Sequence, residues 1–400
     1  MSGGPLEAEH DERMRSVVEL AQELIRRPSR GGVDDYGPVL GVLEDWLTGA
    51  GLPHRRLHDA DGALVGLLVE IAGSRPGPGP WWTLDACVDT APYGDTTRWS
   101  FHPTSGQERD GWLLGRGAAD SKLAAAMFCH IAADLAPRAH EFAGGLAVLL
   151  DVDEHTGNFG GARAYLTDPQ AARPAGVIIG YPGMDEVVVG GRGLWRATIA
   201  VHAPSGHSGS SRSVTGAITR AARLVHLLDT ANLPGPDAAS GFPLGPKLTV
   251  TAFHGGEGFS VTPDRVDINV DVRTTPSFDM HDAETLVRKA VAELDAELPV
   301  PIPTEIAEVA AWPAFRLEES EQPAAALLSA AREAGLDVRA KTAGPSNIGN
   351  LLAGHGIPAT AGFGVPYEGL HGIDERASLA ELPTVHTVHE QAVLSLLGIR

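Results

Sequence analysis

Cysteine, basic residues and long apolar runs are all scarce in this chain of 400 residues. The only two cysteines, Cys87 and Cys129, exclude a disulfide scaffold and fit a reducing compartment. Lysine and arginine together number 31 against 51 acidic residues, which gives a formal net charge of −20. This negative balance argues against sequence-independent binding of nucleic acid, and against an anionic membrane surface as partner.

No segment reaches the roughly 18 uninterrupted apolar residues that a membrane span requires. The N-terminal segment lacks a basic region followed by an apolar stretch, so it does not resemble a secretion signal. These features predict a cytoplasmic protein. With 43% hydrophobic residues, the chain is long enough for two or three domains with a large core.

Short apolar strands alternate with helical patterns in the first half of the chain. The predicted elements are strands at 64–73, 81–89, 144–155 and 175–182, and helices at 12–28, 37–50 and 118–136. Buried apolar strands that alternate with helices favour an α/β fold with a mixed, mostly parallel sheet.

The pattern changes after residue 193. The elements predicted there are strands at 194–204, 247–256, 264–275 and 303–312, and helices at 215–231 and 281–298. This β-α-β-β-α-β order is typical of a small α+β, ferredoxin-like sandwich. Helix and strand alternation then returns, so we predict a discontinuous α/β domain at 1–190 and 311–400, with an α+β domain inserted at 191–310.

Four segments with reactive side chains lie at predicted strand ends, where open α/β sheets place their sites. Together they contain metal-ligating or acid–base groups, namely Cys87, Asp89, Asp120, Asp153, Glu154, His155 and His371. Each has an ordinary alternative, such as a helix cap for Asp120 or a simple loop position for a single histidine.

These segments resemble the zinc exopeptidase family of aminoacylases, acetylornithine deacetylase, succinyl-diaminopimelate desuccinylase and glutamate carboxypeptidases. Residues 115–122 read G-R-G-A-A-D-S-K, close to the family's G-R-G-x-x-D-x-K, and 205–209 and 243–276 resemble segments of its inserted domain. The resemblance covers nearly the whole chain. It implies a phosphorylase/hydrolase-like catalytic domain with an inserted lid through which the protein forms a homodimer.

The metal motifs depart from the family pattern. Cys87 stands where the first motif, G-H-x-D, has its histidine ligand, and Asp89 is kept. The third motif, normally D-E-E, reads D-E-H at 153–155, so the general base is retained and a histidine replaces the ligand carboxylate. The fourth, normally G-E-P or G-D-P, has Tyr181 in place of its carboxylate.

The resemblance implies that one metal ion is bound by Asp120, His155 and His371. Two histidines and one carboxylate make a sound catalytic zinc site. A second ion would take Cys87, Asp120 and Tyr181, but a phenolate ligand must lose a proton with a pKa of about 10. We therefore predict one zinc per chain. Two ions, no ion, another divalent metal, or iron in a facial triad are the alternatives.

The resemblance also implies roles for three neighbouring side chains. Glu154 would be the general base that takes a proton from water and returns it to the leaving nitrogen. Asp89 would orient a ligand, although Cys87 offers no imidazole to hold. His207 matches the lid histidine that helps to stabilise the oxyanion.

Substrate binding is predicted at two places. Arg273 could hold a substrate carboxylate in a bidentate pair, or it could form an ordinary ion pair on its strand. The loop that reads G-x-S-D-x-R in the family is G-P-S-N-I-G at 344–349, so its aspartate and arginine are missing. Ser346 and Asn347 of this loop are predicted to bind the end group of the substrate.

We therefore predict a zinc-dependent enzyme that acts on the amide bond of an N-acyl amino acid or small peptide, a small molecule with an amide and a carboxylate. Acyl transfer, cyclisation or isomerisation on the same fold is an alternative. A non-catalytic binding protein with a decayed metal site is another. Cys87 has three possible roles: a metal ligand, a nucleophile, or an inert apolar side chain.

Overall fold

The computed structural model describes residues 5–211 and 215–399. Residues 1–4 and 400 of the predicted α/β domain, and 212–214 of the predicted inserted domain, lie outside the described residues. The chain forms two compact units. The first comprises Met1–Val189, Leu317–Lys341 and Asn347–Arg400, and the second comprises Gly190–Arg316 and Thr342–Ser346. The predicted boundaries differ from this division mainly at 311–316 and 342–346, which the sequence analysis assigned to the α/β domain.

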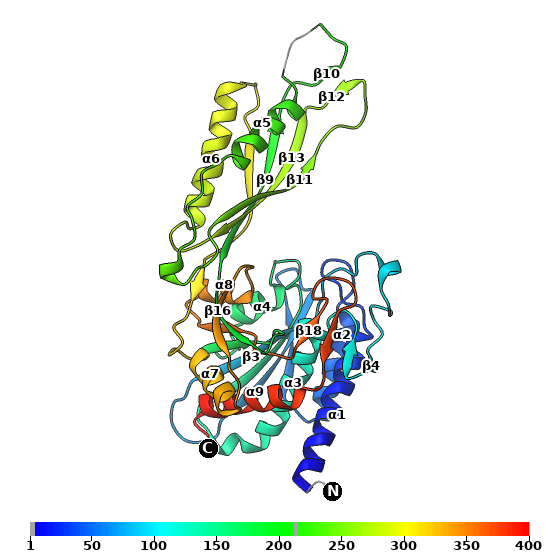
Figure 1. The fold of residues 1–400 in the computed structure, drawn as a ribbon, viewed down its shortest axis with the longest axis vertical. Coiled ribbons are helices and arrows are strands. Elements are labelled where there is room, and N and C mark those ends of the chain that lie inside the picture. The colour runs from blue at the N-terminus through cyan, green and yellow to red at the C-terminus, as the bar shows by residue number, and fades with distance from the viewer. Residues whose placement is uncertain (1–4, 212–214, 400) are drawn as a thin grey trace. The chain divides into compact units, whose positions relative to one another are not determined.

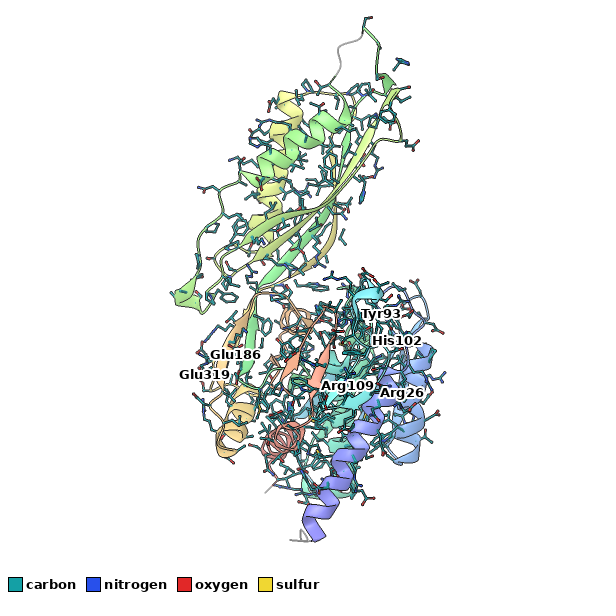
Figure 2. The ribbon with its side chains drawn as sticks, turned by 45° about the vertical axis from the view of Figure 1, so that its right-hand side comes forward. Arg26, Tyr93, His102, Arg109, Glu186 and Glu319 are labelled. Carbon is teal, nitrogen blue, oxygen red and sulfur yellow. The ribbon has the colours of Figure 1, made fainter. Side chains whose placement is uncertain are left out.

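A mixed sheet forms the centre of the first unit (Figure 1). Its strands follow the order β1 (His54–His58), β2 (Leu64–Ala72), β6 (Gly145–Asp151), β3 (Trp81–Cys87), β7 (Gly176–Ile179), β17 (Ala359–Ala361) and β8 (Glu186–Gly191), with β16 (Arg339–Ala343) beside β8. The central strands β6, β3, β7 and β17 are parallel, and the flanking strands are antiparallel. The predicted mixed α/β fold is thus confirmed. Glu186 of β8, which is labelled in Figure 2, forms an ion pair with Lys341 of β16.

Helices cover both faces of this sheet because its central strands are apolar on both sides. The helices of the first unit are α1 (Pro5–Ile25), α2 (Gly37–Gly49), α3 (Leu123–Leu135), α4 (Gly160–Thr167), α7 (Ala324–Glu333), α8 (Ile348–Gly354) and α9 (Leu382–Leu397). Successive side chains of β3 point to opposite faces. Trp82 donates to the Leu396 carbonyl of α9 at 2.9 Å, whereas the Thr83 hydroxyl bonds to Tyr165 of α4 at 2.9 Å. Helices α9 and α4 therefore lie on opposite faces.

The predicted helix at 118–136 begins five residues later than expected. Residues 118–122 form an irregular turn, in which Asp120 (φ −123°, ψ 93°) and Ser121 have non-helical backbones. Its peptide groups turn toward the carboxylate of Glu375, which accepts the N–H groups of Gly117 and Ala119 at 2.9 and 3.1 Å. The alanine-rich pattern predicts helix, but this buried acceptor decides the local backbone.

A small antiparallel sheet in the first unit joins two distant parts of the chain. It consists of β18 (Tyr367–Glu368), β19 (Arg376–Ser378), β5 (Trp112–Leu114) and β4 (Gln107–Arg109). The chain from β18 to β19 carries His371, and the chain that leaves β5 carries Asp120. Pairing of β19 with β5 therefore brings these two segments together.

The second unit is a four-stranded antiparallel sheet with two helices. The sheet order is β11 (Lys247–His254), β13 (Arg265–Thr274), β9 (Gly193–His202) and β14 (Glu305–Trp312), and the helices are α5 (Ala217–Asp229) and α6 (Met280–Glu297). Alternate residues of β13, such as Ile268 and Val270, are buried with Leu224 of α5 and Val287 of α6. The β-α-β-β-α-β pattern predicted from the sequence is confirmed.

Three short strands complete the second unit: β10 (Gly206–His207), β12 (Val261–Thr262) and β15 (Phe315–Arg316). Strand β10 pairs with β12, and β15 pairs with Gly190 and Gly191 at the end of β8. Across the described residues of both units, no helix has the length and apolar character needed to cross a membrane.

Candidate metal centre

Four segments of the first unit meet at the carboxyl end of its sheet. Asp89 follows β3, and His155 follows β6. Because β3 and β6 are parallel neighbours, paired as far as Cys87 and Asp151, the residues that follow them emerge side by side. Asp120 and His371 come from the two segments joined by the small sheet.

Asp120, His155 and His371 form one cluster. His371 Nε2 lies 2.8 Å from Asp120 Oδ2, and His155 Nε2 lies 3.5 Å from the same oxygen. The two imidazole rings are 5.3 Å apart. One potential ligand atom from each of the three residues lies within 4.8 Å of the others. Two imidazoles and one carboxylate are a donor set that fits a catalytic zinc ion.

The environment of His155 also fits a bound cation. Both of its ring nitrogens are buried, and neither makes a hydrogen bond within the described parts of the chain. An unpaired buried nitrogen is costly, and a metal ion would satisfy Nε2. Burial disfavours a charged imidazole, but the carboxylates of Asp120 and Asp89 outweigh it, and the pKa of His155 is raised. Negative charge therefore gathers where a cation would bind.

Asp89 holds the segment that carries His155. Its carboxylate accepts the backbone N–H of Glu154 at 3.2 Å and that of His155 at 3.0 Å. Asp89 Oδ2 also lies 3.5 Å from His155 Nδ1. A carboxylate behind a ligating imidazole fixes the ring and its tautomer. Cys87 offers Asp89 no imidazole, and in the structure the imidazole beside Asp89 is that of His155.

Glu154 is in position to act as a base beside this cluster. Its carboxylate oxygen lies 3.6 Å from His155 Nδ1. Burial raises the pKa of Glu154 to about 7. Burial opposes ionisation of Asp120 too, but the nearby imidazole of His155 and the hydrogen-bonded imidazole of His371 outweigh it and lower the pKa of Asp120. The two carboxyl groups thus differ: Asp120 is held ionised, as a ligand must be, and Glu154 is suited to exchange a proton near neutral pH.

Cys87 lies at the side of the cluster. Its sulfur is 3.4 Å from the Ser121 hydroxyl, and burial raises the pKa of its thiol. Cys87, Asp89 and His155 form a second group of potential ligands within 4.8 Å of one another. Both groups share His155, whose Nδ1 faces Asp89 and whose Nε2 faces Asp120.

Three buried acidic residues of this region were not singled out by the sequence analysis. Glu375 supports the turn that carries Asp120, and only its position shortly after His371 hinted at a role. Asp85 and Asp151 are fully buried, and their carboxylate oxygens have no hydrogen-bond partner among the described residues. Burial raises the pKa of Asp85 to about 8. Both lie within the predicted strands at 81–89 and 144–155.

The predicted substrate-binding residues have partners of their own. Arg273 donates to both carboxylate oxygens of Asp271, at 2.7 and 3.2 Å, and to the Ser346 hydroxyl at 3.2 Å. The structure therefore shows the ion pair that was the alternative to carboxylate binding. Ser346 donates to a backbone carbonyl at 2.8 Å. Asn347 caps helix α8 by accepting the N–H of Gly349 at 2.8 Å.

His207 lies in the second unit, exposed on β10. Its Nδ1 accepts the backbone N–H of Gly209 at 3.0 Å. A role for His207 in stabilising an oxyanion stays a prediction.

An α/β sheet that gathers two histidines and several carboxylates at its carboxyl edge, joined to a ferredoxin-like unit, is the arrangement expected of a metal-dependent amide hydrolase. Residues 85–395 match the profile of peptidase family M20/M25/M40. The chain belongs to this family, as the motifs predicted.

Two relatives illustrate the similarity in sequence. The succinyl-diaminopimelate desuccinylase of Beijerinckia indica is 25% identical over 383 residues, covering 94% of this chain and 97% of the relative. That of Paracoccus denitrificans is 29% identical over 294 residues, covering 71% and 74%.

Solved structures share the fold at lower identity. A Staphylococcus aureus tripeptidase superposes with a TM-score of 0.75 at 18% identity, covering 96% of this chain and 99% of the other. An M20 family metallo-carboxypeptidase of Sulfolobus solfataricus gives a TM-score of 0.76 at 16% identity, with the same coverage.

Proposed function

We propose that this protein hydrolyses the amide bond of an N-acyl amino acid or small peptide, with one zinc ion held by Asp120, His155 and His371. The observation that carries the proposal is the cluster of these three residues, in which His155 has two buried nitrogens without hydrogen bonds and Glu154 lies alongside. The relatives named as desuccinylases and peptidases support an amide substrate.

A bound zinc ion would polarise the amide carbonyl and make a nearby water more acidic. Glu154 takes a proton from the attacking water as the new C–O bond forms. It returns that proton to the nitrogen as the C–N bond breaks, so the products are a carboxylic acid and an amine, and the acid then loses its remaining proton to solvent. Asp89 holds the backbone of Glu154 and His155 in place throughout.

The proposal of a single ion rests on the chemistry of Cys87 and Tyr181, the side chains that would have to help bind a second ion. Burial raises the pKa of both the Cys87 thiol and the Tyr181 phenol, so each holds its proton more tightly than in water. A metal ligand of either type must be deprotonated. A second ion would also compete with Asp89 for His155 Nδ1. These costs favour one zinc over two.

The substrate is proposed to be a small molecule that carries a carboxylate near its amide. If Arg273 binds that carboxylate, the substrate must displace Asp271 from the guanidinium. Ser346 and Asn347 would contribute only through the local structure that they stabilise. A homodimer formed through the inserted domain and a cytoplasmic location remain predictions.

The test is elemental analysis of untagged protein, purified without added metal or chelator, combined with an assay of N-succinyl and N-acetyl amino acids and dipeptides. We expect about one zinc per chain, and its loss in His155→Ala and His371→Ala. His58→Ala, which removes an exposed histidine of β1, is the matched control and should keep the metal. Two ions per chain would refute the single-ion site, and failure to cleave any amide would refute the proposed function.

A further inference from the structure

Tyr181 lies at the same edge of the sheet as the candidate metal ligands. Strand β7 pairs in parallel with β3, with Ile179 beside Asp85. The backbone N–H of Gly180 then donates to the Asp85 carbonyl at 2.7 Å, which continues the pairing. Two residues beyond the Asp85–Ile179 pair, the two chains reach Cys87 and Tyr181, so Tyr181 lies at the level of Cys87 in the row of strand ends from which the site is built.

The backbone of Tyr181 is held by a neighbouring segment. The N–H of Gly183 donates to the Val365 carbonyl at 3.0 Å, and the N–H of Gly364 donates to the Gly183 carbonyl at 2.8 Å. The two segments are so close that a Cβ atom at Gly364 would lie 2.3 Å from the Tyr181 carbonyl oxygen. Only glycine allows this approach, and it fixes where the Tyr181 side chain begins.

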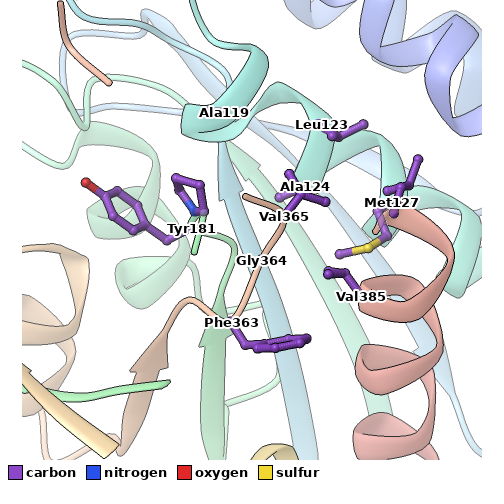
Figure 3. A pocket seen from close by; sticks show the side chains of 11 residues that line it. Ala119, Leu123, Ala124, Met127, Tyr181, Phe363, Gly364, Val365 and Val385 are labelled. Carbon is purple, nitrogen blue, oxygen red and sulfur yellow. The ribbon is translucent and has the colours of Figure 1, made fainter. Parts of the chain in front are cut away.

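The ring and the hydroxyl of Tyr181 have different surroundings. The ring forms part of the wall of a small apolar pocket that also includes Leu123, Met127, Phe363 and Val385. Figure 3 shows the phenol oxygen directed away from these side chains. No hydrogen bond to this oxygen is formed by any residue in the described ranges, and the oxygen is not sealed in the interior. The ring is thus packed while its donor is available.

The charges around the phenol favour a neutral donor. Burial and then the carboxylates of Asp120 and Glu154 raise the pKa of Tyr181. An ionised phenol is therefore disfavoured. A protonated phenol has a positive end, its O–H, near a site where a substrate oxygen becomes negative during amide hydrolysis.

We infer that Tyr181 is a catalytic hydrogen-bond donor, whose O–H stabilises the oxygen of the scissile amide as that oxygen gains negative charge. This inference rests on the proposed amide hydrolysis and assigns Tyr181 a role other than metal ligation. The proton stays on the phenol throughout. As the water oxygen bonds to the carbonyl carbon, charge moves to the amide oxygen, and it returns when the C–N bond breaks. Glu154 alone carries the transferred proton.

The experiment compares Tyr181→Phe with wild type on the N-acyl amino acid or dipeptide that wild type cleaves best. Phenylalanine keeps the ring in the pocket wall and removes only the hydroxyl. Loss of one such donor lowers kcat by about 100- to 1,000-fold. Because the donor acts on charge that develops in the transition state, KM should change little. Zinc content and melting temperature should equal those of wild type.

Tyr367→Phe is the matched control, because Tyr367 is a nearby tyrosine that is 39% exposed on β18. It should keep wild-type kcat and zinc content. A second readout is the affinity of a phosphinic dipeptide analogue, whose charged oxygens imitate the transition state. It should bind Tyr181→Phe more weakly by a factor similar to the loss in kcat, while the amine product binds equally well.

Wild-type kcat in Tyr181→Phe would overturn this inference and leave the proposed function intact. Loss of zinc from Tyr181→Phe would also overturn it, because the phenol would then be a ligand. If wild type cleaves no amide, both the proposed function and this inference fail. The two failures are therefore distinguishable.

Discussion

Glu375 and Arg116 form an ion pair in the interior of the first unit, where their side chains are 0% and 2% exposed. The second carboxylate oxygen of Glu375 accepts the backbone N–H groups of Gly117, Ala119 and Asp120 at 2.9, 3.1 and 3.3 Å. Glu375 follows His371 closely in the chain. One buried carboxylate therefore joins the segment that carries His371 to the turn that carries Asp120.

Replacing Glu375 should damage both stability and the metal site. Glu375→Gln leaves Arg116 buried without its counter-charge, which typically costs about 3–5 kcal/mol. The turn around Asp120 would also loosen, so zinc affinity should fall about 10- to 100-fold. Urea denaturation and competition with a chelator measure the two effects.

The control for this change is Glu368→Gln. Glu368 forms an exposed ion pair with Arg376, and such pairs contribute about 0–1 kcal/mol. If the two variants lose stability equally, burial of the Glu375 pair has no special importance.

Glu154→Gln should abolish turnover with little effect on the fold. Glutamine fills the same space but cannot accept the proton from water, and general-base catalysis typically contributes about 100- to 10,000-fold in rate. Zinc content and melting temperature should stay at wild-type values, because Glu154 is not one of the proposed ligands. Initial rates on the best substrate measure the loss. A variant that still turned over normally would show that another group is the base.

Asp89 and Cys87 should respond differently to substitution, although both lie near His155. Asp89→Asn weakens the support of the segment that carries His155, and loss of such support behind a metal ligand typically lowers metal affinity about 10- to 100-fold. Cys87→Ser should leave zinc content near one per chain, because the proposed ion does not use the thiol. Zinc content during titration with a chelator compares the two variants. Equal loss in both would indicate that Cys87 is a ligand.

The sequence is sufficient to predict the main strands and to predict that the segments with the candidate metal ligands lie close together. Apolar runs such as 81–89 and 144–155 read as buried strands, and parallel strands bring their carboxyl ends together. Strands β18 and β19 have only two and three residues, so they show no periodicity. The role of Glu375 depends on backbone N–H groups of a distant turn, and no side-chain pattern reveals it. The sequence leaves open which group binds the Arg273 guanidinium, and the structure shows that it is the carboxylate of Asp271.

Two buried histidines of α9 lie outside the candidate site. His386 and His389 are 1% and 0% exposed, and their ring nitrogens have no hydrogen-bond partner among the described residues. The His389 ring packs against Phe128, with centroids 5.2 Å apart, and the His386 ring lies 6.4 Å from that of His10. Burial lowers the pKa of each to about 3. Both are therefore neutral in the folded protein down to acidic pH.

These histidines should make the fold sensitive to mild acid. Below an unfolded-state pKa of about 6.5, the unfolded chain binds protons that the folded chain excludes, so each histidine lowers stability by about 1.4 kcal/mol per pH unit. The loss begins near pH 6.5 as the pH falls, and it is absent above that value. His389→Leu removes one such group. The measurement is the unfolding free energy of wild type and of His389→Leu in urea, from pH 7 to pH 5. Taking the difference between the two proteins removes the effects of the metal site, because both proteins share that site. That difference should shift in favour of the variant as the pH falls, and parallel curves would show that His389 titrates normally in the folded protein.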